Sequence, residues 1–328
     1  MKKLYVITVL LVCAIAALAS PVQAVEVRVE VADLNAGYAL PAYSAGDTLR
    51  IVGAVPLNAA GWETLRNASV RFALILDNGQ TSIPDNAMAL NSTAPTSVTG
   101  ARVTQVGKGA FRGCISLERV SFPALTTIDD DAFYACARLE SITLSNVSSL
   151  GRNAFQGCEN LRNVSMPSVE SIPNGAFLNC RALTSLSLPR AKTIGQGAFE
   201  SNSSLTTVSL PAATIVDSRA FYRASSLAEI SLPSVTEIRS EAFAGCTALR
   251  ILRLGNANPS VSENAFQGVG RITIYSNRTS LTSRNYPPYD LATSNDSAGG
   301  GCDATAANAG LFVLLCAALF LKRKSPKG

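Results

Sequence analysis

Cysteine is the chemically reactive side chain that this sequence repeats at a regular spacing. The 328 residues include eight cysteines. Thiols at a regular spacing could form disulfides, bind a metal ion or supply a nucleophile. The chain contains no histidine, which excludes Ser-His-Asp and Cys-His nucleophiles, histidine zinc sites and any histidine general base. Carboxylate, lysine or tyrosine chemistry stays open. Five of the cysteines form one series in the middle of the chain: Cys114, Cys136, Cys158, Cys180 and Cys246.

The series favours buried free thiols over the three reactive uses. Asn202 and Ala224 stand where the period would place a cysteine, so the position accepts other small side chains. Neighbouring cysteines would have parallel Cα–Cβ vectors, which is poor disulfide geometry. A metal site needs ligands gathered around one point, and a thiol nucleophile has no histidine to activate it. We therefore predict no catalytic residue, no metal site, no cofactor and no enzymatic activity.

The element that positions these cysteines is a repeat built around the dipeptide Ala-Phe. Within each unit the cysteine, or its replacement, follows the phenylalanine by three residues, and in the first seven units a leucine follows by six. Such a period is the mark of a repeat architecture. The phenylalanines recur every 22 residues, with a last interval of 23: Phe111, Phe133, Phe155, Phe177, Phe199, Phe221, Phe243 and Phe266.

Each unit contains one strand and one tight turn. Apolar residues nine and eleven positions after the phenylalanine alternate with polar ones, which is the period of a strand. The spacing of three within Ala-Phe-x-x-Cys-x-x-Leu suits a single helical or 3-10 turn with one buried edge. One unit cannot bury its apolar edge alone, so units must stack. The sequence predicts an α/β repeat solenoid, with a parallel sheet on one face and short helical or 3-10 turns behind it.

The repeat resembles a known family. Leu-x-x-Leu-x-Leu at this period is the leucine-rich repeat signature. Runs such as Ala154-Phe155-Gln156-Gly157-Cys158-Glu159-Asn160-Leu161 resemble the BspA-like leucine-rich repeat proteins of bacterial surfaces, over about residues 80–275. The resemblance implies a solenoid at the cell surface that serves adhesion or protein binding. It implies no catalytic residue, and it supplies no shared binding residues to transfer.

The residues before the regular repeats read as an N-terminal cap region, residues 25–100. Ser82–Met88 matches Ser171–Phe177 and forms a degenerate first repeat that lacks the cysteine and the leucine. Terminal units are atypical because they cover an open core. The regular solenoid is assigned to residues 101–280, with a final short strand at Gly270–Tyr275. Further elements expected in the cap are strands at Val25–Val31, Thr48–Val55 and Val70–Leu76, and a short helix at Trp62–Asn67.

The first 24 residues have the three parts of a secretory signal peptide. Met1-Lys2-Lys3 is basic, Leu4–Leu18 is apolar and uncharged, and small residues precede a cleavage site after Ala24. We expect signal peptidase to cut there, so that the mature chain begins near Val25.

The last residues form a second three-part signal. Residues 281–301 read as a flexible linker, and residues 302–328 carry an uncharged stretch followed by Lys322-Arg323-Lys324. Eighteen helical residues would rise about 27 Å, close to a bilayer core. A plain membrane anchor is one interpretation. The other is a sorting signal, held in the membrane until a protease cuts near Gly300, Gly301 and Cys302.

This tail resembles the Gly-Gly-type C-terminal sorting signals of Gram-negative bacteria, and most of all the Synergistes-type version with Gly-Gly-Cys. The resemblance implies a sorting protease in the membrane and a product that is exported to the outer surface or secreted. The formal net charge of +5 also belongs to the ends, because six lysines and arginines lie there and the body is left with −1. Nucleic acid is therefore not an expected partner.

The candidate binding face is the outward side of the predicted strands. Outward positions lie eight and ten residues after each phenylalanine, and serine and threonine fill most of them. Tight interfaces concentrate Trp, Tyr and Arg, so the middle of this face is a poor interface. A specific partner is expected near the ends of the array. The candidate residues are Arg119, Asn163, Glu229, Arg253, Trp62 and Tyr275.

Two functions fit these features. The first is a non-enzymatic, exported leucine-rich repeat protein that binds protein partners or mediates adhesion at the bacterial surface. The alternative is a structural envelope or spacer component without a specific ligand, which the plain serine-threonine face favours. An ordered surface such as ice or a glycan is a further, less favoured partner for that face.

Overall fold

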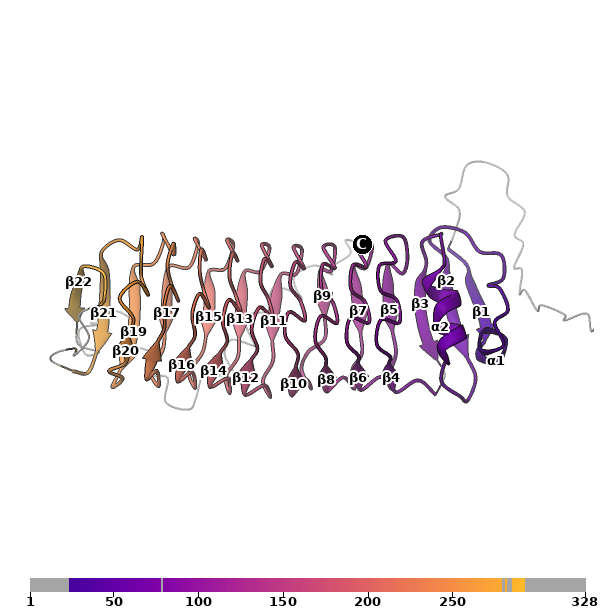
Figure 1. Ribbon diagram of the computed structural model, residues 1–328, viewed down its shortest axis with the longest axis horizontal. Helices are drawn as coiled ribbons and strands as arrows, with labels where there is room; N and C mark the ends of the chain where they lie inside the picture. The colour runs from indigo at the N-terminus through magenta and orange to yellow at the C-terminus, as the bar shows by residue number, and fades with distance from the viewer. Residues whose placement is uncertain (1–23, 78, 279–280, 282–284, 293–328) are drawn as a thin grey trace, which may run out of the picture.

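The chain forms a long, nearly straight solenoid of stacked turns (Figure 1). The computed structural model describes residues 24–77, 79–278, 281 and 285–292. The predicted signal peptide up to residue 23 and the processing residues Gly300, Gly301 and Cys302 lie outside the described residues, as does the predicted membrane span. No helix of the described part is long and apolar enough to cross a membrane.

A row of parallel strands, which we call the wide sheet although it is divided into two hydrogen-bonded parts, runs along the whole solenoid (Figure 1). Neighbouring strands come from successive turns, mostly 22 residues apart, as in Ser185↔Thr207. The strands are β1 (Glu26–Glu30), β2 (Thr48–Val52), β3 (Ala73–Asp77), β5 (Ser97–Thr99), β7 (Arg119–Ser121), β9 (Ser141–Ile142), β11 (Asn163–Ser165), β13 (Ser185–Ser187), β15 (Thr207–Ser209), β17 (Glu229–Ser231), β19 (Ile251–Gly255), β21 (Ile272–Ser276) and β22 (Tyr289–Ala292).

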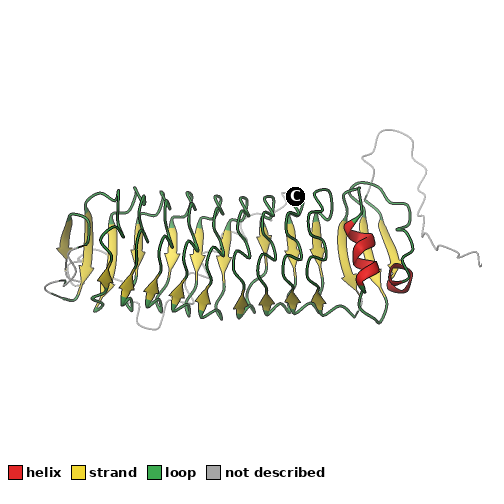
Figure 2. Ribbon diagram, viewed as in Figure 1, coloured by secondary structure: helices red, strands yellow, loops and turns green. Residues whose placement is uncertain are grey.

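A second, narrower row of two-residue strands runs parallel to the first (Figure 2). Each strand ends with an apolar residue that turns inward, such as the fully buried Ile172 and Ile194. These strands are β4 (Ser82–Ile83), β6 (Gln105–Val106), β8 (Thr127–Ile128), β10 (Ser149–Leu150), β12 (Ser171–Ile172), β14 (Thr193–Ile194), β16 (Ile215–Val216), β18 (Glu237–Ile238) and β20 (Ser260–Val261).

The third side of each turn is a tight backbone turn around the Ala-Phe dipeptide. The Phe155 N–H donates to Ala176 O of the next turn at 2.8 Å, whereas the Gln156 N–H donates to Asn153 O of its own turn. This alternation needs left-handed backbone beside the phenylalanine, at Asn153 (φ 53°) and Gly157 (φ 76°), which Asn and Gly tolerate best. The repeats therefore confirm the parallel solenoid, but their turns are not helices, and the two helices of the described residues both precede residue 67.

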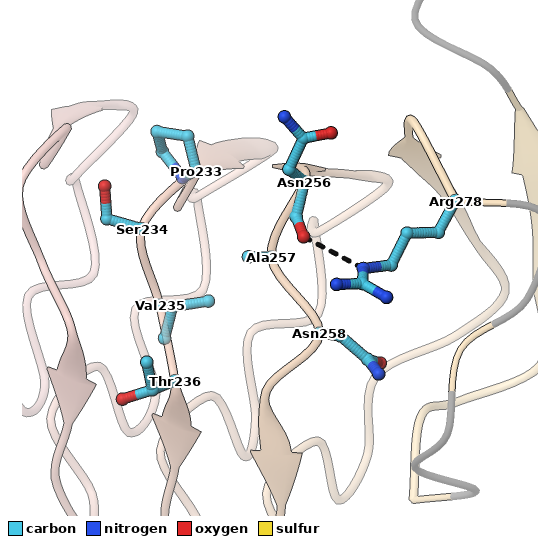
Figure 3. Close-up of a pocket in the computed structure, with 8 residues that line it drawn as sticks. All are labelled: Pro233, Ser234, Val235, Thr236, Asn256, Ala257, Asn258 and Arg278. Atoms are coloured by element: carbon cyan, nitrogen blue, oxygen red, sulfur yellow. Dashed lines mark hydrogen bonds between the residues drawn. The ribbon is translucent and has the colours of Figure 1, made fainter.

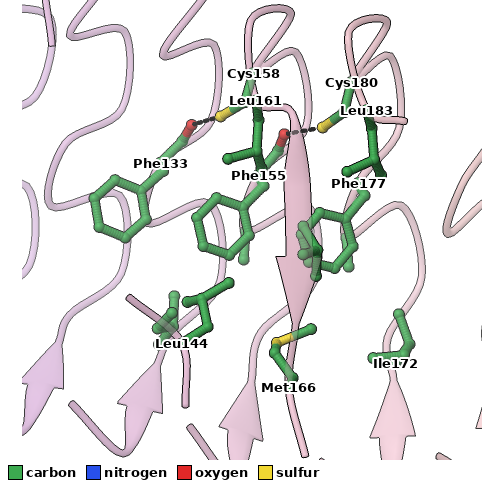
Figure 4. Close-up of a cluster of buried hydrophobic side chains, with 14 of the residues drawn as sticks. Phe133, Leu144, Phe155, Cys158, Leu161, Met166, Ile172, Phe177, Cys180 and Leu183 are labelled. Atoms are coloured by element: carbon green, nitrogen blue, oxygen red, sulfur yellow. Dashed lines mark hydrogen bonds between the residues drawn. The ribbon is translucent and has the colours of Figure 1, made fainter. Parts of the chain in front are cut away.

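The phenylalanines form one continuous stack through the core, of which Figure 4 shows Phe133, Phe155 and Phe177. Adjacent rings from Phe111 to Phe266 have centroids 5.2–5.4 Å apart and interplanar angles of at most 14°. The separation is close to the spacing of adjacent strands, about 4.8 Å, because each turn is a translated copy of the last. The predicted phase of the repeat is confirmed, since each phenylalanine is at most 5% exposed.

The cysteine position is a hydrogen-bond donor as well as a small side chain. The five cysteines of the repeat series are free and buried, as predicted. The Cys158 thiol donates to Phe133 O at 3.2 Å and the Cys180 thiol to Phe155 O at 3.1 Å (Figure 4). Asn202 keeps this bond through Nδ2, which lies 2.9 Å from Phe177 O. The sequence argument from size alone missed this bond, which joins each turn to the preceding one.

Asn202→Cys is expected to raise the free energy of unfolding by about 1 kcal/mol. The change keeps a donor to Phe177 O and removes Asn202 Oδ1, which is buried without a hydrogen-bond partner among the described residues. Urea unfolding followed by circular dichroism measures the effect. Asn202→Ala is the matched control, because it removes the acceptor and the donor together and should gain less. A less stable Asn202→Cys variant would show that the amide is satisfied in solution.

The wide sheet begins in the N-terminal residues. β1, β2 and β3 pair in parallel and lead into β5, with Glu26↔Thr48 and Ala73↔Ser97 in register. The three strands expected between residues 25 and 76 are confirmed, with bounds shifted by a few residues. Asn91 takes the cysteine position of the degenerate first repeat, and its Nδ2 donates to Arg66 O at 2.7 Å.

Two helices replace the tight turns in this N-terminal part. α2 (Ala59–Arg66) begins three residues before the predicted helix, because the Asn58 side chain accepts a hydrogen bond from Gly61 N and caps it. α1 (Val31–Asn35) was not expected from the sequence. Both helices bury apolar residues against the core, including Leu34 and Leu65.

The linker prediction for residues 281–301 is wrong where the structure describes them. β22 pairs in parallel with β21 over four residues, from Ile272↔Tyr289 to Tyr275↔Ala292. Tyr286 packs its ring 5.9 Å from Phe266 at the end of the phenylalanine stack. Gly270–Tyr275 is therefore not the last strand. The repeat pattern did not predict this turn, because its strand follows β21 by only 17 residues and the turn contains no Ala-Phe dipeptide.

Both sheets are interrupted near the Phe155 turn, between β9 and β11 and between β10 and β12. The second interruption has a clear cause. Gly151 N donates to Ile128 O at 2.7 Å and Gly195 N donates to Ile172 O at 2.8 Å. Pro173 occupies the same position in its turn and has no N–H to donate, so this bond cannot form there.

Candidate binding face

The exposed side of the wide sheet is formed by alternate strand residues. In β7 and β11 the central valine is buried, and the residues before and after it are exposed. The repeat therefore sends every second strand side chain to solvent, as the sequence predicted. Arg119 and Asn163 both lie on this face.

The middle of the face is a plain array of hydroxyl groups. From β5 to β17 the outward positions hold no aromatic residue, and Asn163 accepts a 2.7 Å hydrogen bond from the Ser185 hydroxyl. These positions are occupied by Ser97, Thr99, Arg119, Ser121, Ser141, Thr143, Asn163, Ser165, Ser185, Ser187, Thr207, Ser209, Glu229 and Ser231.

A shallow hollow of about 350 Å³ interrupts the array over β5, β7 and β9. Its lining combines serine and threonine residues and Arg119 with the apolar residues Val98, Val120 and Ile142. Arg119 is 63% exposed and lies 3.7 Å from the Glu118 carboxylate. At this distance and exposure the pair is weak, so Arg119 is not held rigidly in one position.

The C-terminal end of the face brings three candidate residues together. Glu229, Arg253 and Tyr275 lie on the adjacent strands β17, β19 and β21. Arg253 Nε donates to the Glu229 carboxylate, and its guanidinium carbon lies 4.4 Å from the centre of the Tyr275 ring. The sequence proposed these residues singly, and the structure shows that they form one cluster, which we call the Arg253 cluster.

The N-terminal end carries a second charged cluster, which the sequence analysis missed. Arg50 on β2 donates to Glu26 on β1 at 2.7 Å and to Asp77 on β3 at 3.1 Å. The hydrogen bond with Arg50 lowers the pKa of Glu26, and the same bond raises the pKa of Arg50. Opposite charges spaced 24 and 27 residues apart were the available signal, but these intervals differ from the 22-residue period.

Trp62 is not part of any binding face. It lies on α2 with only 3% of its surface exposed. Its indole is part of the hydrophobic core of the N-terminal turns. The prediction that Trp62 anchors a partner is therefore wrong, because helix α2 turns this side chain inward.

The described residues offer hydrogen-bonding and charged groups for contact with a partner. They contain no group of three or more His, Cys, Asp or Glu side chains that could hold a metal ion. Burial raises the pKa of Cys114 to about 12 and raises that of Cys136 and Cys158 strongly, which disfavours the reactive thiolate. The surface features that stand out are the hydroxyl array and the clusters at its two ends.

Comparison with known proteins identifies the repeat. The family model described as BspA type leucine rich repeat region matches residues 81–206 and 214–287, in six copies. No curated protein matches the chain.

Solved structures of similar proteins come from several bacteria. A leucine-rich repeat protein of T. pallidum is 25% identical and has a TM-score of 0.42, covering 54% of this chain and 77% of that one. A leucine rich cell surface protein of Faecalibacterium prausnitzii is 19% identical, with a TM-score of 0.39 and coverage of 75% and 87%. A leucine-rich repeat protein of Bacteroides ovatus is 17% identical, with a TM-score of 0.45 and coverage of 82% and 87%.

Proposed function

The chain belongs to the BspA type leucine-rich repeat family, and on this premise we propose that it is a non-enzymatic surface protein that binds protein partners. The observation that carries the proposal is the Arg253 cluster. It gathers an arginine, a tyrosine and a carboxylate at the C-terminal end of the strand face, and it is the cluster of that face that contains an aromatic ring.

The cluster has the properties of an interface anchor. Arginine and tyrosine are enriched among the residues that contribute most to protein binding. Arg253 is held from two sides, by Glu229 and by the Tyr275 ring, yet its side chain is still 40% exposed. A side chain already held in place loses less conformational entropy when a partner binds.

Export and surface display complete the proposal. They rest on the sequence of the two ends: a signal peptide cut by signal peptidase after Ala24, and a tail that a sorting protease processes near Gly300, Gly301 and Cys302. Before that cut, the tail would anchor the protein in the membrane. One of the similar structures is described as a cell surface protein.

A structural spacer without a specific ligand is the second candidate. The observation that favours it is the hydroxyl array from β5 to β17, which lacks aromatic residues. A surface of this composition is poor in strong binding residues. The two functions differ in whether the protein retains any partner through a defined residue.

Tyr275→Ala is expected to weaken partner binding by about 30-fold or more, the effect of losing a residue worth 2 kcal/mol. Purified protein is immobilised and exposed to envelope and host-surface extracts, and the affinity of each retained protein is then measured. The control is Ser187→Ala, which removes an exposed hydroxyl from the middle of the same face and should change nothing. Equal binding by both variants would place the binding site elsewhere. Failure of the unaltered protein to retain any partner would favour the spacer.

A further inference from the structure

A polar groove lies at the carboxyl ends of three neighbouring strands. It has a volume of about 430 Å³ and follows β17, β19 and β21, where the chain leaves the wide sheet (Figure 3). Arg278 is the one charged residue that lines it. The lining residues are Pro233, Ser234, Val235, Thr236, Asn256, Ala257, Asn258 and Arg278.

Arg278 is held so that part of its guanidinium faces the groove. Its Nε donates to Asn256 O on the neighbouring turn at 2.9 Å, and its backbone N–H donates to Ser276 Oγ at 3.1 Å. Figure 3 shows the side chain reaching across toward Asn256, with the terminal nitrogens between Ala257 and Asn258. Among the described residues the guanidinium has this single hydrogen bond, through Nε.

Three other arginines of the last turns have carboxylate partners, whereas Arg250 donates to the Thr247 and Leu249 backbone carbonyls. Arg253 pairs with Glu229, and Arg271 pairs with Asp290 at 2.7 Å. Arg239 pairs with Asp217 and Glu237. Arg278 has no such pair among the described residues, and no acidic side chain lines the groove. Within the described residues, the groove is therefore a positively charged site without a paired carboxylate.

The chemistry that fits this site is a carboxylate. A guanidinium presents two parallel N–H donors that match the two oxygens of a carboxylate. One arginine balances the single charge of a carboxylate, whereas a phosphate monoester carries about 1.5 to 2 negative charges. The Ser234 and Thr236 hydroxyls already donate to backbone carbonyls at 2.9 and 3.0 Å, so they offer no further donor for a second charge.

The groove adjoins the Arg253 cluster. Tyr275 on β21 precedes Arg278 by three residues, a separation of at most about 10 Å along an extended chain. A short extended peptide that contacts the Tyr275 ring can thus reach the Arg278 guanidinium with an acidic side chain.

We propose that the groove binds an aspartate or glutamate carboxylate of an extended peptide segment, with Arg278 as the recognition residue. This inference rests on the proposed function, because it supplies the chemistry of the partner segment that also meets the Arg253 cluster.

The test is an NMR titration of the full chain with a blocked pentapeptide that carries glutamate at its centre. The matched peptide carries glutamine instead. The Arg278 Nε–Hε signal and the side-chain amide signal of Asn256 should shift with the glutamate peptide, and the glutamine peptide should bind at least tenfold more weakly. Inorganic phosphate is titrated separately as a second anion, and it should bind more weakly than the glutamate peptide.

Three variants test whether Arg278 is the residue that recognises the carboxylate. Arg278→Gln should weaken binding of the glutamate peptide at least tenfold, and Arg278→Lys should also weaken it, because lysine has no fork to bind both oxygens. Arg190→Gln is the control, since it removes the same charge from an exposed pair with Glu170 far along the chain from the groove. Thermal unfolding verifies that the variants are folded.

Three results would overturn the proposal. They are equal binding by the unaltered protein and Arg278→Gln, an equal loss in Arg190→Gln, and phosphate binding tighter than that of the glutamate peptide. Tyr275→Ala separates this proposal from the proposed function, because it should weaken capture of the whole partner about 30-fold or more and weaken binding of the glutamate peptide less than tenfold. If no partner is captured and the peptide still needs Arg278, the groove stands and the proposed function fails.

Discussion

Replacing Phe177 with alanine is expected to lower the free energy of unfolding by about 3–5 kcal/mol, the cost of deleting a large aromatic side chain from a core. Phe177 is fully buried. Its ring lies 5.2 Å from Phe155 and 5.3 Å from Phe199, centroid to centroid. The variant would leave a cavity at the point where two turns meet, and the rigid backbone bonds around it oppose collapse of the cavity.

The same substitution should change how the solenoid unfolds. Each turn contacts only its neighbours, so a weak turn separates the array into two blocks. Urea unfolding of Phe177→Ala, followed by circular dichroism, should show a broader or two-step transition where the unaltered protein shows a sharper one. Ser187→Ala is the control, because it removes an exposed group from the following strand. A Phe177→Ala cost below about 1 kcal/mol would mean that the ring is exposed in solution.

The Cys114 and Cys246 thiols are expected to react about a thousandfold more slowly in the folded protein than in the denatured protein, and the other three thiols of the series should also be slowed. Burial raises the pKa of Cys114 from 9.0 to about 12, and that of Cys246 likewise. A rise of three pKa units lowers the thiolate fraction about a thousandfold, and the thiolate is the reactive form. Labelling with a thiol reagent and peptide mass mapping measures each cysteine separately. If a thiol of the series stays unlabelled in denatured, unreduced protein, that cysteine forms a disulfide.

The raised pKa values also predict the pH dependence of stability. In the folded chain the thiols stay protonated above pH 9, whereas in the unfolded chain they ionise. Their contribution to stability is therefore complete below pH 9 and is lost as the pH rises above 9. For Cys114 and Cys246 the loss continues towards pH 12, at about 1.4 kcal/mol per thiol for each pH unit.

Cys158→Ala isolates one thiol of this set. At pH 7 it should cost modest stability, because it removes the 3.2 Å bond to Phe133 O. Above pH 9 its stability should fall less steeply than that of the unaltered protein, by the share of one thiol. The difference between the two unfolding curves isolates the contribution of Cys158. Parallel curves at pH 9 to 11 would mean that Cys158 is ionisable in the folded state.

The repeat was predictable because its physics is local and translated. Residues 22 positions apart occupy equivalent places in successive turns, so a sequence period becomes a column of side chains in space. The Phe111–Phe266 stack, the buried cysteines and the outward Ser/Thr positions all follow from this rule. The hydrogen bond from each thiol to a backbone carbonyl of the preceding turn did not, because it depends on the exact offset between neighbouring turns.

The structure at the two ends was not predicted, because the regular 22-residue translation from turn to turn does not continue there. The sequence predicted Trp62 as a residue of the binding face, but helix α2 places its side chain in the core. β22 follows β21 by 17 residues instead of 22, so the repeat pattern does not predict this strand. The pairing of Arg50 with Glu26 and Asp77 uses offsets other than 22.

The solenoid, the phase of its core and the composition of its strand face could all be predicted from the repeat period, since each depends only on which residue stands at which step of that period. The tertiary structure decided which surface residues meet. Glu229, Arg253 and Tyr275 became one cluster because parallel pairing sets them side by side, and Arg278 came to line a groove because the strands β17, β19 and β21 end together. Such contacts depend on how the chain leaves each strand, which follows no period.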